Sequence, residues 1–191
     1  MKKKYFEVSR SSAFSIKVLG KCIYTYYNHL IMQLNKREAV FDFQSSDDFV
    51  AKTMTKEVIE CCVNSDFDNR YMEFLRKKYN ELFCGVALFY RGELCGYICG
   101  LKPKSREQQY RIKNCEFFVK YVFVYEKFRG RGIASKLFEY LFQTFNINEV
   151  VFAVRVNNHS AIRAYVKTGA EEIARRKFIR ILKFNIPYYK V

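Results

Sequence analysis

One stretch near the middle of the chain, residues 122–135, limits its possible folds more than any other. β-branched and aromatic residues between positions 117 and 125 predict a strand. An apolar stripe spaced four residues apart predicts a helix that follows it, and the stripe consists of Ile133, Leu137, Leu141 and Phe145. Gly130 and Gly132 stand at the junction, where the backbone must come close to another group. The stretch therefore predicts a strand, a glycine turn and a helix.

A helix that begins at a glycine turn is suited to binding phosphate. Its first backbone N–H groups have no partner within the helix and lie at the positive end of the helix dipole. A phosphate can bind there without any side chain. Arg129 and Arg131 add formal positive charge beside that end. Residues 129–135, called the phosphate cradle below, are therefore predicted to bind a phosphate or pyrophosphate.

Two common phosphate-binding loops do not fit this stretch. A P-loop ends in Gly-Lys-Ser/Thr, whereas Ile133 follows Gly132 here. A dinucleotide-binding fingerprint requires Gly or Ala where this chain has Ser135, and its acidic partner about 20 residues further on is missing. Both classes of nucleotide site are excluded.

The pattern that does fit is Arg/Gln-x-x-Gly-x-Gly/Ala, which Arg129, Gly132 and Ala134 match. It resembles the acetyl-CoA loop of the GNAT acetyltransferase superfamily. A second segment, residues 158–169, looks like the later motif of that family, Asn-x-x-Ala-hydrophobic-x-x-Tyr-x-x-x-Gly. The order and separation of the two motifs are also similar to those of the family, and the resemblance covers about residues 84–185.

The resemblance implies an α/β (α+β) fold. Its centre is a mixed, mostly antiparallel sheet of six to seven strands, flanked by about four helices and joined by an added N-terminal element. We expect residues 1–36 to be an N-terminal extension packed on the domain. Residues 37–191 are expected to form the GNAT-like acyltransferase domain.

The second half of the apolar segment 14–34 fits helical spacing through Ile23, Tyr27, Leu30, Ile31 and Leu34. A basic amphipathic helix can lie on a membrane or bind a partner, but we expect this one to pack on its own domain.

Further patterns predict a strand over 38–44, helices from 45–48 through 58 and over 66–82, a hairpin over 84–101, a strand over 149–154, a helix over 158–167 and one or two closing strands over 173–186.

Composition indicates which ligands and which cellular compartment suit this protein. The net charge of +15 over 191 residues indicates either a solvated basic surface or an anionic ligand or partner, and coenzyme A would account for part of this charge.

The seven cysteines are odd in number and form no Cys-x-x-Cys pair, which favours free thiols in a reducing compartment over disulfides or zinc. No signal peptide or apolar run of about 18 residues is present, so we expect a cytoplasmic protein without a transmembrane segment.

The resemblance also implies roles for individual residues. The expected coenzyme-binding residues are Val122, Phe123, Val124, Arg129, Gly130, Arg131, Gly132, Ile133, Ala134, Ser135 and Asn158. The strand before the phosphate cradle is expected to carry a β-bulge, which opens a gap for the pantetheine arm. Tyr165 is expected to act as the general acid that protonates the departing thiolate, since a phenol is protonated at neutral pH.

The general base is less clear in the sequence. Glu116 on the central strand is one candidate, directly or through water, and His159 beside the motif asparagine is another. Ribosomal-protein N-terminal acetyltransferases usually have a glutamate five residues before that asparagine, where this chain has Ala153. This difference argues against that subgroup.

The predicted activity is acetyl-CoA-dependent N-acetylation of a primary amine on a small molecule or aminosugar, by direct attack. Acetyl-CoA is the expected cosubstrate, no metal is expected, and the protein is expected to be a monomer or homodimer. The alternatives are a catalytically silent CoA-binding protein, a protein or peptide N-acetyltransferase, and a nucleic-acid-binding module. The last lacks a helix-turn-helix, zinc or RNP-like pattern, so nucleic acid is not an expected partner.

Overall fold

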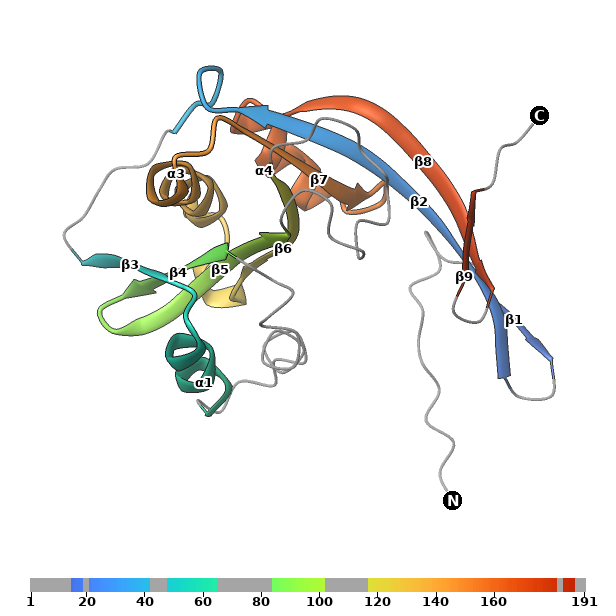
Figure 1. Ribbon diagram of the computed structural model, residues 1–191, viewed down its shortest axis with the longest axis horizontal. Coiled ribbons are helices and arrows are strands. Elements are labelled where there is room, and N and C mark those ends of the chain that lie inside the picture. The colour runs from blue at the N-terminus through green and yellow to red at the C-terminus, as the bar shows by residue number, and fades with distance from the viewer. Residues whose placement is uncertain are drawn as a thin grey trace.

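The structure is a computed structural model, and it describes residues 15–18, 21–41, 48–64, 84–101, 117–181 and 184–187. Its elements are β1 (Ser15–Val18), β2 (Lys21–Asn35), β3 (Phe49–Thr53), α1 (Lys56–Asn64), β4 (Cys84–Tyr90), β5 (Glu93–Leu101), β6 (Phe118–Val124), the short 3-10 helix η1 (Glu126–Phe128), α3 (Ile133–Phe145), β7 (Glu149–Arg155), α4 (His159–Lys167), β8 (Glu171–Ile181) and β9 (Phe184–Pro187) (Figure 1).

The described strands form one sheet in the order β3-β4-β5-β6-β7-β2-β8-β9, with β1 paired to β2. The β6–β7 pair is parallel. The other pairs are antiparallel. This mixed, mostly antiparallel sheet with flanking helices confirms the predicted fold class. The parallel pair lies in the middle of the sheet, and the far end of β6 leads to the glycine turn.

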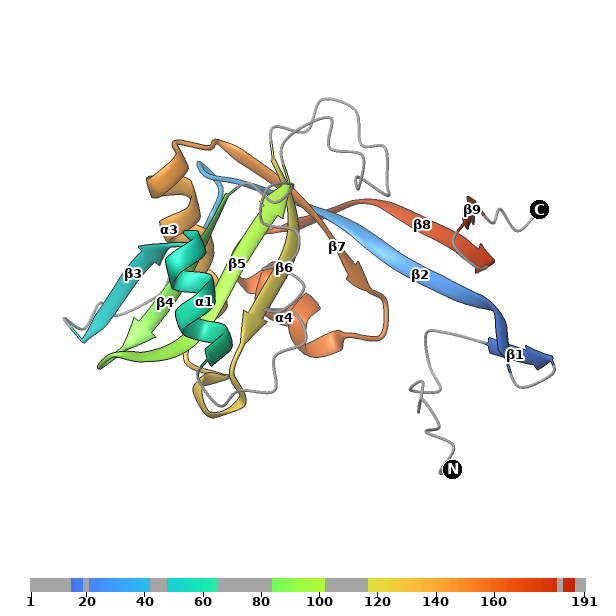
Figure 2. The same cartoon turned by 60° about the horizontal axis from the view of Figure 1, so that its bottom comes forward.

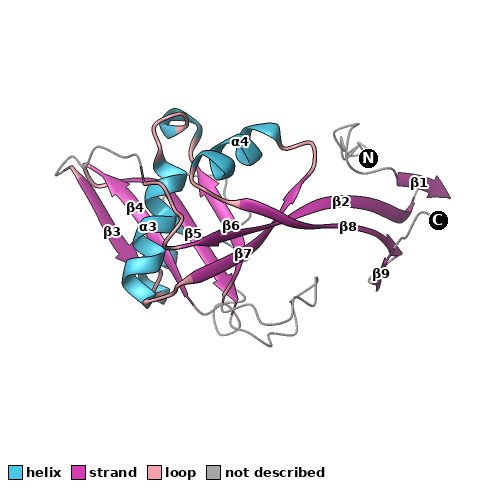
Figure 3. Ribbon diagram, turned by 90° about the horizontal axis from the view of Figure 1, so that it is seen from above, coloured by secondary structure: helices cyan, strands magenta, loops and turns pink. Residues whose placement is uncertain are grey.

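Helices cover both faces of the sheet. α3 and α4 lie on one side (Figure 3), whereas α1 lies across β4 and β5 on the other side (Figure 2). The predicted apolar stripe of α3 faces the main core, and Ile133, Leu137 and Leu141 are all at most 1% exposed. Burial of this stripe against the sheet is what positions the N-terminus of α3.

The N-terminal segment differs from the prediction. Residues 21–35 form strand β2 rather than a helix, and this strand runs through the sheet between β7 and β8. β2 pairs with β7 over residues 29–35 and with β8 over residues 24–33. Together β2 and β8 extend past the helices and carry β1 and β9 at their far ends (Figures 1 and 3).

The region after β2 also differs from the prediction. Residues 36–38 form a turn and residues 39–41 have no regular structure, so the strand predicted over 38–44 is wrong for its described part, while 42–47 lie outside the described residues. The predicted helix start at 45–48 is wrong too, because β3 follows there and α1 begins at Lys56. Thr55 supplies the cap, since its Oγ1 accepts a hydrogen bond from the Val58 N–H at 3.3 Å.

The other predicted elements are found, except the helix over 66–82, which lies outside the described residues. The hairpin turn contains two residues, Arg91 and Gly92, because Tyr90 pairs with Glu93. Arg91 and Gly92 have φ angles of 49° and 83°, as the two central residues of a tight hairpin turn require. No helix within the described ranges is long and apolar enough to cross a membrane.

Candidate active site

Strands β6 and β7 separate soon after they pair. The ladder contains only Phe118 opposite Val151 and Val119 opposite Phe152. On the other edge of β6, Val119 pairs with Gly100 and Tyr121 pairs with Cys99, which leaves Lys120 as an extra residue. This register shift is the β-bulge that was expected in the central strand. Beyond it, the backbone of β6 no longer pairs with β7, and a gap opens between them.

A cavity of about 870 Å³ lies at this gap. Its volume falls within the usual range for small-molecule sites. β6, the phosphate cradle, α4, β7 and one residue of β2 form its walls. Each predicted coenzyme-binding residue except Arg131 lines it. The structure therefore brings both sequence motifs to one cavity, although their roles in binding remain predictions.

The N-terminus of α3 faces this cavity without a side-chain cap. Gly132 is the N-cap residue, with a φ of 72°, and no side chain accepts a hydrogen bond there. Gly130 has a φ of 77°, and a Cβ built on it would have no atom within 4 Å. Both glycines thus hold left-handed backbone, and Gly130 does so beside open space. This arrangement fits a pyrophosphate bound by the backbone N–H groups of the first turn.

The two arginines of the phosphate cradle have different surroundings. The Arg129 Nε donates a hydrogen bond to the Val124 carbonyl at 3.2 Å, which joins the cradle to the end of β6. The Arg131 guanidinium lies 6.0 Å from the centre of the Phe128 ring, outside the cavity wall. Arg129 is therefore the better placed of the two to contact a ligand in the cavity.

Asn158 begins α4 and also lines the cavity. Its Oδ1 accepts a hydrogen bond from the Ala161 N–H at 3.3 Å, which is a typical helix cap. Within the described residues the Nδ2 group makes no hydrogen bond, so it can donate to a ligand. The helix cap and the predicted contact to the coenzyme therefore use different atoms of one side chain.

Tyr165 lies in the wall of the cavity and is 9% exposed. Its ring meets Phe138 edge-on, with centroids 5.8 Å apart, and Phe152, with centroids 4.8 Å apart. Burial raises the pKa of Tyr165 to about 12. The phenol is therefore protonated at neutral pH, as a general acid requires.

His29 on β2 is a cavity residue that sequence reasoning missed. It is 8% exposed, and its Cα lies opposite that of Arg155 on β7. Burial, and then the charge of Arg155, lower the pKa of His29 to about 4. The imidazole is therefore neutral at physiological pH. No local signal marks this histidine, because only the pairing of β2 with β7 brings it to the cavity.

One candidate base lies outside the described residues, and the other lies away from the cavity. Glu116 lies outside the described residues, so its role stays a prediction. His159 begins α4 and is exposed, and it does not line the cavity. Within the described ranges, no group of three or more His, Cys, Asp or Glu residues could hold a metal ion.

Residues 48–170 match the model of the acetyltransferase (GNAT) family, and the chain belongs to this family. The spermine/spermidine N(1)-acetyltransferase of Bacillus subtilis (strain 168) is 29% identical over 89 residues, which cover 44% of this chain and 57% of that protein.

Solved structures of the same superfamily share the fold. A GCN5-related N-acetyltransferase from Sphaerobacter thermophilus is 15% identical, with a TM-score of 0.56 over 92% of this chain and 55% of that one. A GNAT-family acetyltransferase from Colwellia psychrerythraea is 15% identical, with a TM-score of 0.54 over 86% of this chain and 57% of that one. The chain thus spans little more than half the length of these relatives.

Proposed function

We propose that this protein transfers an acetyl group from acetyl-CoA to a primary amine of a small molecule or aminosugar. The observation that carries the proposal is the cavity between β6 and β7, because it joins the phosphate cradle to Tyr165 in one continuous site. Family membership supports acyl transfer. The relative that acetylates spermine and spermidine supports an amine as the acceptor.

In this proposal each part of the cavity has one task. The first turn of α3 and Arg129 hold the pyrophosphate of the coenzyme. The bulged edge of β6, residues 122–124, offers backbone groups to the pantetheine arm, and the Asn158 Nδ2 donates to it. When bound, acetyl-CoA supplies an activated acetyl group as a thioester. The chain itself therefore contributes mainly orientation and hydrogen bonding.

The proton transfers complete the proposed mechanism. Tyr165 holds a proton at neutral pH and gives it to the departing sulfur. The acceptor amine must be neutral to attack, and Glu116 is the proposed base, directly or through water. His29 carries an unprotonated nitrogen, which is a weak base at its lowered pKa. We assign it no proton transfer.

Two measurements on one sample test the proposed function. Acetyl-CoA should raise the thermal unfolding midpoint, since a ligand that binds only the folded state stabilises it. A panel of amines should then release free coenzyme A thiol. Stabilisation without thiol release from any amine would identify a CoA-binding protein without catalysis. The absence of both effects would contradict the assignment of the cavity.

The proposed setting is the cytoplasm, with a monomer or homodimer as the working unit. Cys95 and Cys99 are both buried thiols outside any disulfide, which is compatible with a reducing compartment. Light scattering on the purified protein measures the oligomeric state directly, and fluorescence microscopy of a tagged chain measures the location.

A further inference from the structure

The cavity passes through the sheet from one face to the other. On the α3 side its wall contains Phe152, whose ring centroid lies 5.4 Å from the ring centroid of Phe138 on α3. On the opposite face its wall contains Phe118 and Ala153, which belong to a separate small apolar cluster with Ile31. The cavity therefore has two ends. The phosphate cradle occupies the first, and the second opens away from α3.

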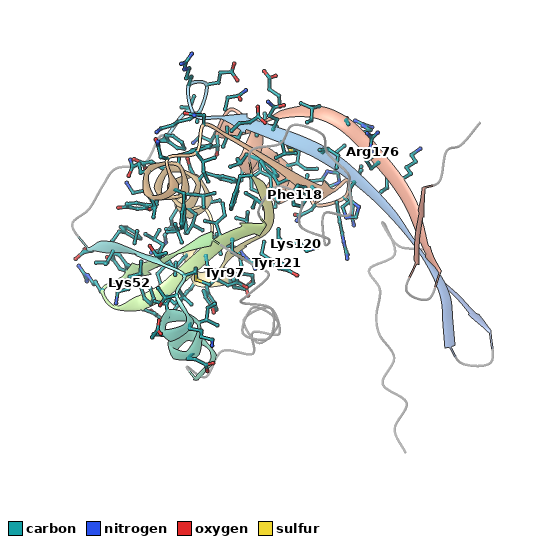
Figure 4. The ribbon with its side chains drawn as sticks, in the orientation of Figure 1. Lys52, Tyr97, Phe118, Lys120, Tyr121 and Arg176 are labelled. Atoms are coloured by element: carbon teal, nitrogen blue, oxygen red, sulfur yellow. The ribbon has the colours of Figure 1, made fainter. Side chains whose placement is uncertain are left out.

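Basic side chains lie at and beside the second end: Arg155 and Lys120 line the cavity, and Arg176 lies outside its wall, next to His29. The β2 ladders place His29 opposite Arg155 on β7 and opposite Arg176 on β8. Residues that lie directly opposite each other in antiparallel strands share a face, and His29 is two positions from Ile31 on that face. Lys120, at the bulge of β6, lines the cavity from the other side of the gap. Figure 4 labels Lys120 on β6 and Arg176 on β8, with β7 and β2 between these strands in the sheet.

Arg155 and Arg176 lack the acidic partners that Arg91 and Arg175 have. Arg91 pairs with Asp48 at 3.2 Å, and Arg175 pairs with Glu172 at 2.6 Å. In the described part of the chain, Arg155 and Arg176 form no ion pair, although they flank the same histidine. No aspartate or glutamate is among the described residues that line the cavity. Arg155 and Arg176 lie on the two strands that flank β2, and an anion bound between these like charges offsets their mutual repulsion.

We infer that the acceptor carries an anionic group, a carboxylate or a phosphate, which Arg155, Arg176 and Lys120 bind at the second end of the cavity. This inference rests on the proposed function. If the coenzyme enters from the phosphate cradle, the acceptor must approach the thioester from the opposite end, past these cations. A polycation such as spermidine meets repulsion there, whereas an amine with a carboxylate or phosphate is held by charge-assisted hydrogen bonds.

Matched amine pairs test this inference. Ethanolamine and O-phosphoethanolamine, and D-glucosamine and its 6-phosphate, share an amine and differ by one phosphate. At constant ionic strength we expect kcat/KM for the phosphorylated member to be about 10- to 100-fold higher, as hydrogen bonds to charged groups allow. Arg155→Gln and Arg176→Gln should reduce this ratio. Arg175→Gln is the matched control, because its side chain is on the same strand but on the opposite face and paired with Glu172.

A second measurement does not depend on turnover. Inorganic phosphate is added to protein saturated with CoA, so that the phosphate cradle is filled, against chloride at equal ionic strength. We expect phosphate to raise the unfolding midpoint of the wild type and of Arg175→Gln, and not that of the Arg155→Gln, Arg176→Gln double variant. An unchanged stabilisation by CoA would show that the double variant is folded.

The two measurements separate the inference from the proposed function. A phosphate-specific shift without turnover of any amine would contradict the proposed activity and keep the anion site. Turnover that favours the unphosphorylated amines or spermidine would overturn the anion site and keep the activity. No phosphate shift in the wild type, or an equal loss in Arg175→Gln, would also overturn it.

Discussion

Tyr165 and His29 are both buried in the wall of the cavity, and burial favours the neutral form of each. For the tyrosine this raises the pKa to about 12. For the histidine, burial and the charge of Arg155 lower the pKa to about 4. At neutral pH the site therefore presents one phenol that can donate a proton and one imidazole that can accept a hydrogen bond.

Replacement of Tyr165 by phenylalanine tests its role as the general acid. The ring contacts with Phe138 and Phe152 remain, and only the hydroxyl is lost. We expect kcat to fall by roughly 10²- to 10⁴-fold, with acetyl-CoA affinity and the unfolding midpoint nearly unchanged. Tyr140→Phe on α3, outside the cavity wall, is the control. Wild-type turnover by Tyr165→Phe, where chemistry limits the rate, would leave water as the proton source.

His29 predicts a specific dependence of stability on pH. Its pKa is about 4 in the folded chain and near the ordinary histidine value of 6.5 in the unfolded chain, so the unfolded state binds more protons between these values. Its contribution to the unfolding free energy is complete above pH 6.5 and is lost as the pH falls toward 4. The loss approaches ~3 kcal/mol at ~1.4 kcal/mol per pKa unit.

Denaturant unfolding at several pH values measures this effect. Arg155 and Arg176 are the charged residues opposite His29 on the neighbouring strands. His29→Gln should show a smaller stability loss between pH 6.5 and 4 than the wild type. His159→Gln, at the exposed start of α4, is the control. Parallel curves for His29→Gln and the wild type would contradict a buried neutral histidine.

Gly132 tests the phosphate cradle. A valine there would be strained at a φ of 72°, and its side chain would project where the pyrophosphate is expected. We expect Gly132→Val to lose acetyl-CoA binding. Gly92→Val is matched for strain, since Gly92 has a φ of 83° and open space around it in a turn outside the cavity wall. Titration calorimetry should show normal binding by Gly92→Val, and normal binding by Gly132→Val would remove the cradle assignment.

The sequence predicts the parts of the site that are local in the chain. Gly132 and Asn158 begin helices, so their positions follow from turn and capping chemistry within a few residues. His29 and Arg155 are different, because strand pairing between distant segments brings them together. The motifs therefore predicted residues that meet at one end of the cavity, the phosphate cradle, whereas its other end required the sheet order.

At the scale of single elements, β2 shows why the spacing of apolar residues predicted a helix where the chain forms a strand. Its residues alternate between two buried clusters, with Leu30, Met32 and Leu34 in the main core and Ile31 in the small one. A strand buried on both faces reads as a continuous apolar run, which spacing alone does not distinguish from a buried helix. The enrichment in Ile, Thr and Tyr over residues 23–27 was the available signal for a strand.

Two truncations test the predicted division of the chain at residue 36. A chain that starts at residue 37 lacks β2, which pairs with β7 and β8 on its two edges. We expect it to lose cooperative unfolding, because two strands become unpaired edges and core side chains are removed. A chain that starts at residue 15 keeps β2 and should unfold cooperatively. Normal folding of residues 37–191, measured by circular dichroism, would support a separable extension.

At the scale of the whole molecule, the net charge of +15 should act on any anionic ligand. We expect the KM for acetyl-CoA to rise several-fold over roughly 0.05–0.5 M salt, since salt screens the attraction of the phosphates. S-acetyl-N-acetylcysteamine is a thioester without phosphates and serves as the control. Its kcat/KM should stay flat over the same range, and a parallel loss for both thioesters would indicate a general effect of salt on the enzyme.

The place of β2 in the sheet also sets the order in which the fold can be completed. β2 is synthesised before its partners β7 and β8, with β3 to β6 between them in the chain. At ~5–20 residues per second, the β2 strand waits on the order of ten seconds for both partners. Contacts between such distant segments make folding slow. The nascent chain thus carries an apolar segment that needs shielding during translation, and β2 is paired on both edges only after β8 has been made.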